Sequence, residues 1–217
     1  MDADRPDAWT EVTTPEQLTA LLGEPLPRVR DKVRPALHPL DAAWLRASPY
    51  VVLATADADG RCDASPKGDP AGGLVHVLDE RTVALAERPG NRRADGYRNV
   101  LTNPRAALLA TIPGRGDLLR VAGRARLVSE APFLDAMVVA GHRPVLALVL
   151  DVEEVFHHCA KAALRAGLWD PATWAPEGPD GSVPRRAVLA RELEQPGADL
   201  ADLDRYYGEG YARLLYG

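Results

Sequence analysis

Apolar and polar residues alternate over several short stretches of the chain, a pattern typical of half-buried strands. Residues 50–55 (YVVLAT) form the first strong strand pattern, as a continuous apolar run, and Asp59-Gly60 marks a hairpin turn after it. Similar runs predict further strands over residues 61–67, 73–79, 82–88, 106–112, 118–128 and 145–156. Six or seven strands joined by short turns fit a small closed antiparallel barrel, because closing a sheet removes its unpaired edges.

Helical patterns lie at both ends of the chain and between the strands. Helix-start residues and apolar residues at helical spacing predict helices near residues 14–22, 39–47, 91–103, 132–140, 185–194 and 199–215. The chain therefore divides into an N-terminal helical extension (1–36), a mainly β, α+β barrel domain (37–175) and a C-terminal helical extension (176–217). A Gly/Pro-rich linker over 176–184 begins the last part, whose helices we expect to pack on the barrel or on a partner.

The amino-acid composition and net charge indicate which class of protein this is. A hydrophobic content of 46% and a charged content of 26% fit a soluble globular protein with a sizeable core. The net charge of −5 argues against general binding to nucleic acid or to an anionic membrane. The acidic start without an apolar segment, and the two cysteines Cys62 and Cys159, predict a cytoplasmic protein with free thiols.

Two neighbouring stretches carry the candidate chemistry. If residues 61–67 form a strand, Asp63, Ser65 and Lys67 share one face, because side chains alternate. Arg92 and Arg93 follow Asn91, a good helix N-cap, and so fall in a first helical turn, where the helix dipole disfavours cations. Two arginines there would be stabilised by an anion bound over the helix N-terminus. The alternative is a solvated surface turn.

Longer motifs in these stretches resemble a known family. Residues 65–70 (SPKGDP), 87–96 (ERPGNRRADG) and 98–104 (RNVLTNP) are similar to motifs of the pyridoxamine 5′-phosphate oxidase-like, FMN-binding split-barrel family, and the resemblance runs from about residue 35 to about residue 175. It implies a split β-barrel that binds FMN and acts as an oxidoreductase on a small molecule. We expect Ser65, Lys67, Arg92 and Arg93 around the FMN phosphate, with Pro66 along the ribityl chain or the ring edge.

Further residues extend this expected site. Arg120 lies mid-strand among apolar residues, where a buried charge needs a partner, and flavin or Asp63 would supply one; the alternative is an outward-facing arginine. The resemblance implies that the segment 157–175 reaches the flavin from the partner chain of a homodimer with flavin sites at the interface. His158 or Lys161 would then donate to the polar edge of the ring, and Trp169 would pack near it. Otherwise Trp169 and Trp174 anchor helices of their own subunit.

Other readings stay open. A flavin- or haem-binding module without turnover and a deazaflavin-dependent reductase are possible on the same barrel, since fold does not fix function. No catalytic residue stands out, and no substrate is identifiable. Consecutive residues of a strand point in opposite directions, so His157, His158 and Cys159 are a poor metal site, and we expect none. We expect that removing the Lys67 or Arg93 side chain weakens FMN binding without affecting folding.

Overall fold

A computed structural model of the chain describes residues 9–174, 183–211 and 213–216. The chain separates into two compact units, Met1–Val33 and Arg34–Gly217. The first unit holds α1 (Pro15–Leu22) and α2 (Pro27–Arg30). Thr14 caps α1 as the sequence predicts, and its hydroxyl accepts a hydrogen bond from the Gln17 N–H at 3.3 Å. No residue of either helix is buried.

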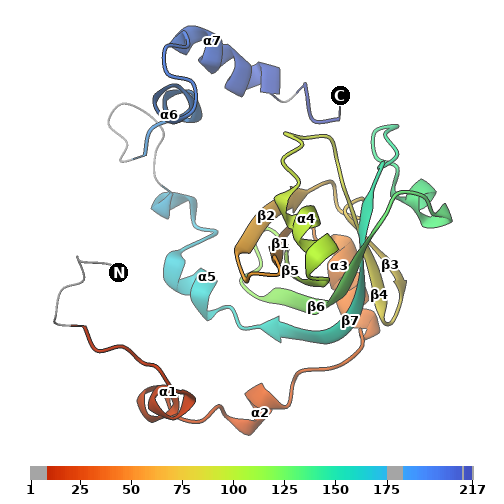
Figure 1. The fold of residues 1–217 in the computed structure, drawn as a ribbon, viewed down its shortest axis with the longest axis vertical. Coiled ribbons are helices and arrows are strands. Elements are labelled where there is room, and N and C mark those ends of the chain that lie inside the picture. Colours follow the sequence, from red (N-terminus) through yellow and green to blue (C-terminus); the bar gives the residue numbers. More distant parts are fainter. Residues whose placement is uncertain (1–8, 175–182, 212, 217) are drawn as a thin grey trace. The chain divides into compact units, whose positions relative to one another are not determined.

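The second unit is built on one antiparallel sheet of seven strands, in the order β2-β1-β5-β6-β7-β4-β3 (Figure 1). The strands are β1 (Tyr50–Ala56), β2 (Cys62–Gly68), β3 (Val75–Asp79), β4 (Thr82–Ala86), β5 (Arg105–Thr111), β6 (Leu118–Val128) and β7 (Ala147–His158). The helical segments around it are α3 (Pro39–Ala47), α4 (Asp95–Thr102), the 3₁₀ turn η1 (Pro132–Met137), α5 (Lys161–Ala166) and the 3₁₀ turn η2 (Pro171–Thr173). This arrangement confirms the predicted α+β split-barrel fold class.

The sheet is not closed, so the expectation of a closed barrel is wrong. β2 and β3 stand at the two ends of the strand order, and no pairing joins them in the described part of the chain. β2 is suited to an edge because Pro66 has no N–H to donate to a further strand. Its free side is therefore available to border a cavity.

The core lies on the inner face of the sheet. Alternate residues of the central strands are fully buried there, including Leu53, Leu108 and Val121. α3 adds Trp44 and Leu45 to this cluster, while α4 adds Tyr97 and Val100. Strand alternation and helix spacing therefore converge on this core. A smaller second cluster lies where η1 packs on β4 and β7, and it contains Ala84, Ala86, Leu134, Met137, Ala147 and Val149.

The buried carboxylate of Asp41 connects the start of α3 to the end of β7 through hydrogen bonds. Asp41 is 1% exposed and accepts two hydrogen bonds from Arg34, at 2.6 and 3.0 Å. The backbone N–H of His38 and Nε2 of His157 lie 2.8 and 3.1 Å from its oxygens. Burial alone would raise the pKa of Asp41, but these hydrogen bonds outweigh it and hold the pKa below its usual value. His157 is thus bound to Asp41 within the fold.

Several helix boundaries differ from the sequence prediction. The predicted helix over 91–103 begins only at Asp95, because Arg92 and Ala94 have positive φ angles of 59° and 55°. The helix predicted over 132–140 is the short η1, and the C-terminal one comprises α7 (Leu200–Arg205) with a π-helical turn over Tyr206–Gly210.

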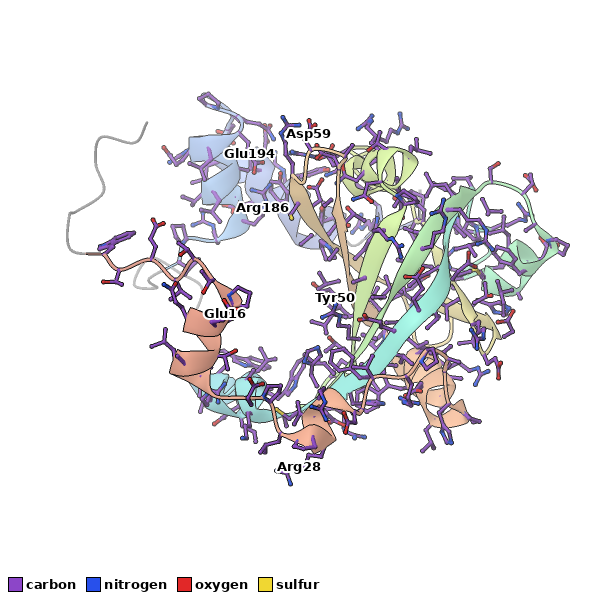
Figure 2. All side chains as sticks on the ribbon, turned by 60° about the horizontal axis from the view of Figure 1, so that its bottom comes forward. Glu16, Arg28, Tyr50, Asp59, Arg186 and Glu194 are labelled. Carbon is purple, nitrogen blue, oxygen red and sulfur yellow. The ribbon has the colours of Figure 1, made fainter. Side chains whose placement is uncertain are left out.

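α7 packs on α6 (Arg186–Leu193) through the buried residues Ala187, Ala190 and Leu203. On α6, Arg186 donates a hydrogen bond of 2.7 Å to Glu194 (Figure 2). Most of the predicted linker at 176–184 lies outside the described residues. None of the described helices combines the length and the apolar character that crossing a bilayer requires.

Candidate functional site

A cavity of about 550 Å³ lies beside the free edge of β2. Its wall is made by Asp63–Gly68 of β2 and by the segment Ala86–Tyr97, with Leu53, Leu74 and Leu215. The sequence places Ser65, Pro66 and Lys67 in one of these stretches and Arg92 and Arg93 in the other. All five border the same cavity.

The β2 wall follows from strand alternation. Asp63, Ser65 and Lys67 pair in register with Thr55, Leu53 and Val51 of β1, whose side chains are buried in the core. The three β2 side chains are therefore on the inner face, and each residue is half-buried. A hydroxyl, a carboxylate and an ammonium thus lie on one face, as the sequence predicts.

Lys67 is already paired in this cavity. Its Nζ lies 2.7 Å from Oε2 of Glu87, and it stands 4.6 Å from the centre of the Tyr97 ring. The Tyr97 hydroxyl donates to the same Glu87 oxygen. Burial, followed by the Glu87 carboxylate, raises the pKa of Tyr97 far above its usual value, so Tyr97 remains a donor. Sequence reasoning missed the roles of Glu87 and Tyr97, since nothing local shows that they meet Lys67.

The turn after β4 carries the two predicted arginines. Asn91 accepts a hydrogen bond of 3.0 Å from the Arg93 N–H, and the left-handed residues Arg92 and Ala94 shape the backbone on either side. Such left-handed residues can turn successive N–H groups towards a common anion. The Arg93 guanidinium donates to Asp95, and this hydrogen bond raises the pKa of Arg93.

Arg88 also borders the cavity but is held by the protein. Its side chain is 10% exposed, and its Nε lies 2.5 Å from Oδ2 of the fully buried Asp69 side chain. Its Nη2 donates to the carbonyls of Gly73 and Met137, at 3.2 and 2.7 Å. Of the four cations that line the cavity, only Arg92 has no ion pair or hydrogen bond within the described residues.

Arg120 lies away from this cavity. It pairs in register with Phe156 of β7, and its guanidinium carbon is 5.5 Å from the centre of the Phe156 ring. Among the described residues, no hydrogen bond or ion pair joins Arg120 to Asp63, so that expected pairing is wrong. Asp63 instead accepts a hydrogen bond of 2.9 Å from Asn99. The Nε of Arg120 is buried without a hydrogen-bond partner in the described structure. Arg120 instead borders a second hollow of about 360 Å³.

The remaining predicted residues do not line the cavity of this one chain. The His158 ring is 4.8 Å from that of Phe156, and Lys161 begins α5. The Trp169 indole donates to the Arg115 carbonyl at 2.7 Å, and the Trp174 indole to a carbonyl of its own segment. Their approach to a flavin from a partner chain stays a prediction. Among the described residues, no cluster of three or more His, Cys, Asp or Glu could hold a metal ion.

Several solved structures are similar to part of this chain. No curated protein matches the sequence. Among solved structures, a putative pyridoxamine 5′-phosphate oxidase from Lactobacillus delbrueckii has 25% identity and a TM-score of 0.44, over 57% of this chain and 95% of the other. A pyridoxamine 5′-phosphate oxidase-related, FMN-binding protein from Nostoc punctiforme has 16% identity and a TM-score of 0.38, over 55% and 82%. The haem storage protein HutZ from Vibrio cholerae has 15% identity and a TM-score of 0.38, over 56% and 93%.

The family match rests on the sequence itself. Residues 37–159 match the family model described as pyridoxamine 5′-phosphate oxidase. The matched segment includes every strand of the sheet and both polar walls of the cavity. Because it spans more than half of the sequence, the chain belongs to the pyridoxamine 5′-phosphate oxidase family.

Proposed function

We propose that this protein binds FMN without a covalent bond and is an FMN-dependent oxidoreductase acting on a small molecule. One observation carries the proposal. The fold brings Ser65 and Lys67 of β2 together with Arg92 and Arg93 of the turn after β4, around a single cavity in an acidic chain. The cavity, at about 550 Å³, is within the usual range for a cofactor site, roughly 300–1,000 Å³.

The residues present fit a phosphate. Arg92 offers a guanidinium that no described residue occupies, and Ser65 offers a hydroxyl. Lys67 is shared with Glu87 at 2.7 Å, but an ammonium group has three protons, and one hydrogen bond to Glu87 leaves two for an anion. To reach the phosphate, the Arg93 guanidinium would either break its hydrogen bond to Asp95 or bind both groups at once. The FMN phosphate would thus be held by charge-assisted hydrogen bonds, while Pro66 and the neighbouring backbone border the rest of the cofactor.

FMN, when bound, supplies the electron and hydride transfer. The residues of this chain bind and orient it: the β2 and 91–94 walls hold the phosphate, and Leu53 and Leu74 provide apolar surface.

We also propose that the working form is a homodimer with its flavin sites at the interface. The core of the sheet is filled by side chains, so a large apolar ring needs cover from outside. On the outward side of β6, away from the cavity, the unpartnered Nε of Arg120 supports a contact with a second subunit on that face, because a buried N–H without a partner costs free energy. The segment 157–175 would reach the ring from the partner chain.

The test of the proposed function is the identity and selectivity of the ligand. The purified protein is expected to be yellow and to release FMN on denaturation, as identified by its mass and absorption spectrum. A titration of the ligand-free protein should show tighter binding of FMN than of riboflavin, because only FMN carries the phosphate. Equal affinity for both, or purification with haem or a deazaflavin in place of FMN, would contradict the proposal.

A further inference from the structure

The C-terminal residues of the chain reach the same cavity. Leu215 is part of its wall, although all other lining residues lie between positions 53 and 97. The next residue, Tyr216, donates a hydrogen bond of 2.5 Å from its hydroxyl to Oδ1 of Asp69. Its ring stacks on that of His142, with the ring centres 5.5 Å apart and the planes 21° apart. Two contacts of different kinds therefore hold the chain beside Leu215.

The attachment point, Asp69, is buried and is held by a second partner. Asp69 comes directly after β2, and its side chain is fully buried. Its second oxygen is held by Arg88, which also donates to backbone carbonyls of Gly73, Met137 and His142. Asp69 therefore keeps its position whether or not Tyr216 is bound to it. The Tyr216 hydroxyl is thus an additional hydrogen-bond partner of a carboxylate that is already held in place.

We propose that residues 213–216 form a C-terminal strap across the cavity, with Tyr216 as its latch and Leu215 as a ligand-contacting residue. The proposal rests on the proposed function, since the ligand it covers is FMN. An apolar side chain at the wall excludes water from a bound ligand, and the latch keeps that side chain in place. The hydrogen bond to Asp69 raises the pKa of Tyr216, so the phenol remains a donor at neutral pH.

The first test measures the dissociation rate of FMN from the full-length protein. Tyr216→Phe removes one hydroxyl and keeps the ring on His142. It should speed FMN release about three- to tenfold, the scale of a typical net hydrogen bond. Tyr211→Phe is the matched control, because that ring packs on Tyr206 and Tyr207. A release rate that is the same in both variants and in the wild type would overturn the strap as a cover.

A second pair of variants tests the contact itself. Leu215→Ala should also speed FMN release, whereas Leu214→Ala should not. Both side chains are exposed, but only Leu215 lines the cavity. Equal effects of the two substitutions would overturn the assigned contact of Leu215 with the ligand.

A third measurement needs no ligand and so separates this proposal from the proposed function. Trypsin can cleave after Arg213, the first residue of the strap, and after the exposed Arg28 of α2, which serves as an internal reference. In the ligand-free protein, Tyr216→Phe should raise the ratio of cleavage after Arg213 to cleavage after Arg28. An unchanged ratio would overturn the latch even if FMN binds. If the wild type fails to bind FMN but the ratio rises, the latch stands and the proposed ligand is wrong.

Discussion

The ion pair between Lys67 and Glu87 changes what a substitution at Lys67 should do. Sequence analysis alone predicts that Lys67→Ala weakens FMN binding and leaves folding intact. In the structure, the Lys67 and Glu87 side chains are only 18% and 27% exposed, and their charged atoms are 2.7 Å apart. Removing the lysine therefore leaves a largely buried carboxylate with the Tyr97 hydroxyl as its remaining partner.

The size of the effect follows from the geometry. At 2.7 Å and an effective dielectric constant of roughly 20, the gross attraction of the two charges is about 6 kcal/mol. Desolvation and side-chain ordering offset much of it, so we expect Lys67→Ala to lower the free energy of unfolding by about 2–3 kcal/mol. Lys67→Ala/Glu87→Gln should recover about half of this loss, because the amide carries no charge and can still accept from Tyr97.

Two assays separate stability from ligand binding. Urea unfolding of the ligand-free wild type, both single variants and the double variant gives the coupling free energy between Lys67 and Glu87. FMN titration of the same four proteins gives the contribution to binding, which should fall by about 1.5–3 kcal/mol in both variants that lack Lys67. A coupling below about 0.5 kcal/mol would refute the reasoning on the ion pair. Full recovery of FMN affinity in the double variant would refute the role of Lys67 in binding the phosphate.

Three further predictions concern other parts of the structure. Arg93→Ala should weaken FMN binding by about 1.5–3 kcal/mol. It should leave the free energy of unfolding nearly unchanged, because its ion pair with Asp95 is exposed to solvent. Titration and urea unfolding measure the two effects, and a large loss of stability would make Arg93 structural. The lowered pKa of Asp41 means that its contribution to stability is present above its unfolded-state pKa of about 3.9 and is lost as the pH falls through the folded-state value. Acid unfolding should therefore be less steep in Asp41→Asn, which should also be less stable at pH 7, and parallel acid profiles would contradict this. Mixing subunits that carry Arg93→Ala with subunits that carry Trp169→Ala should restore one flavin site per mixed dimer, whereas a monomer by size-exclusion chromatography, or no restored site, would contradict shared sites.

The sequence by itself determined the elements of the sheet and one wall of the site. The strand at Leu118–Val128 and the helix at Pro39–Ala47 have their predicted bounds, because period-2 and helical patterns are local properties of the chain. The shared face of Asp63, Ser65 and Lys67 is equally local, since it needs only strand alternation.

Tertiary structure decided which of these polar groups have partners. Glu87 meets Lys67, and Tyr216 meets Asp69, only after the chain has folded back on itself. The open edge of β2 likewise depends on how the whole sheet is ordered. Hydrogen bonds and ion pairs between residues far apart in the sequence have no period and no local signal. The sequence can therefore show which charged side chains are candidates for the cavity. Only the tertiary structure shows which of those charges are already paired with another residue.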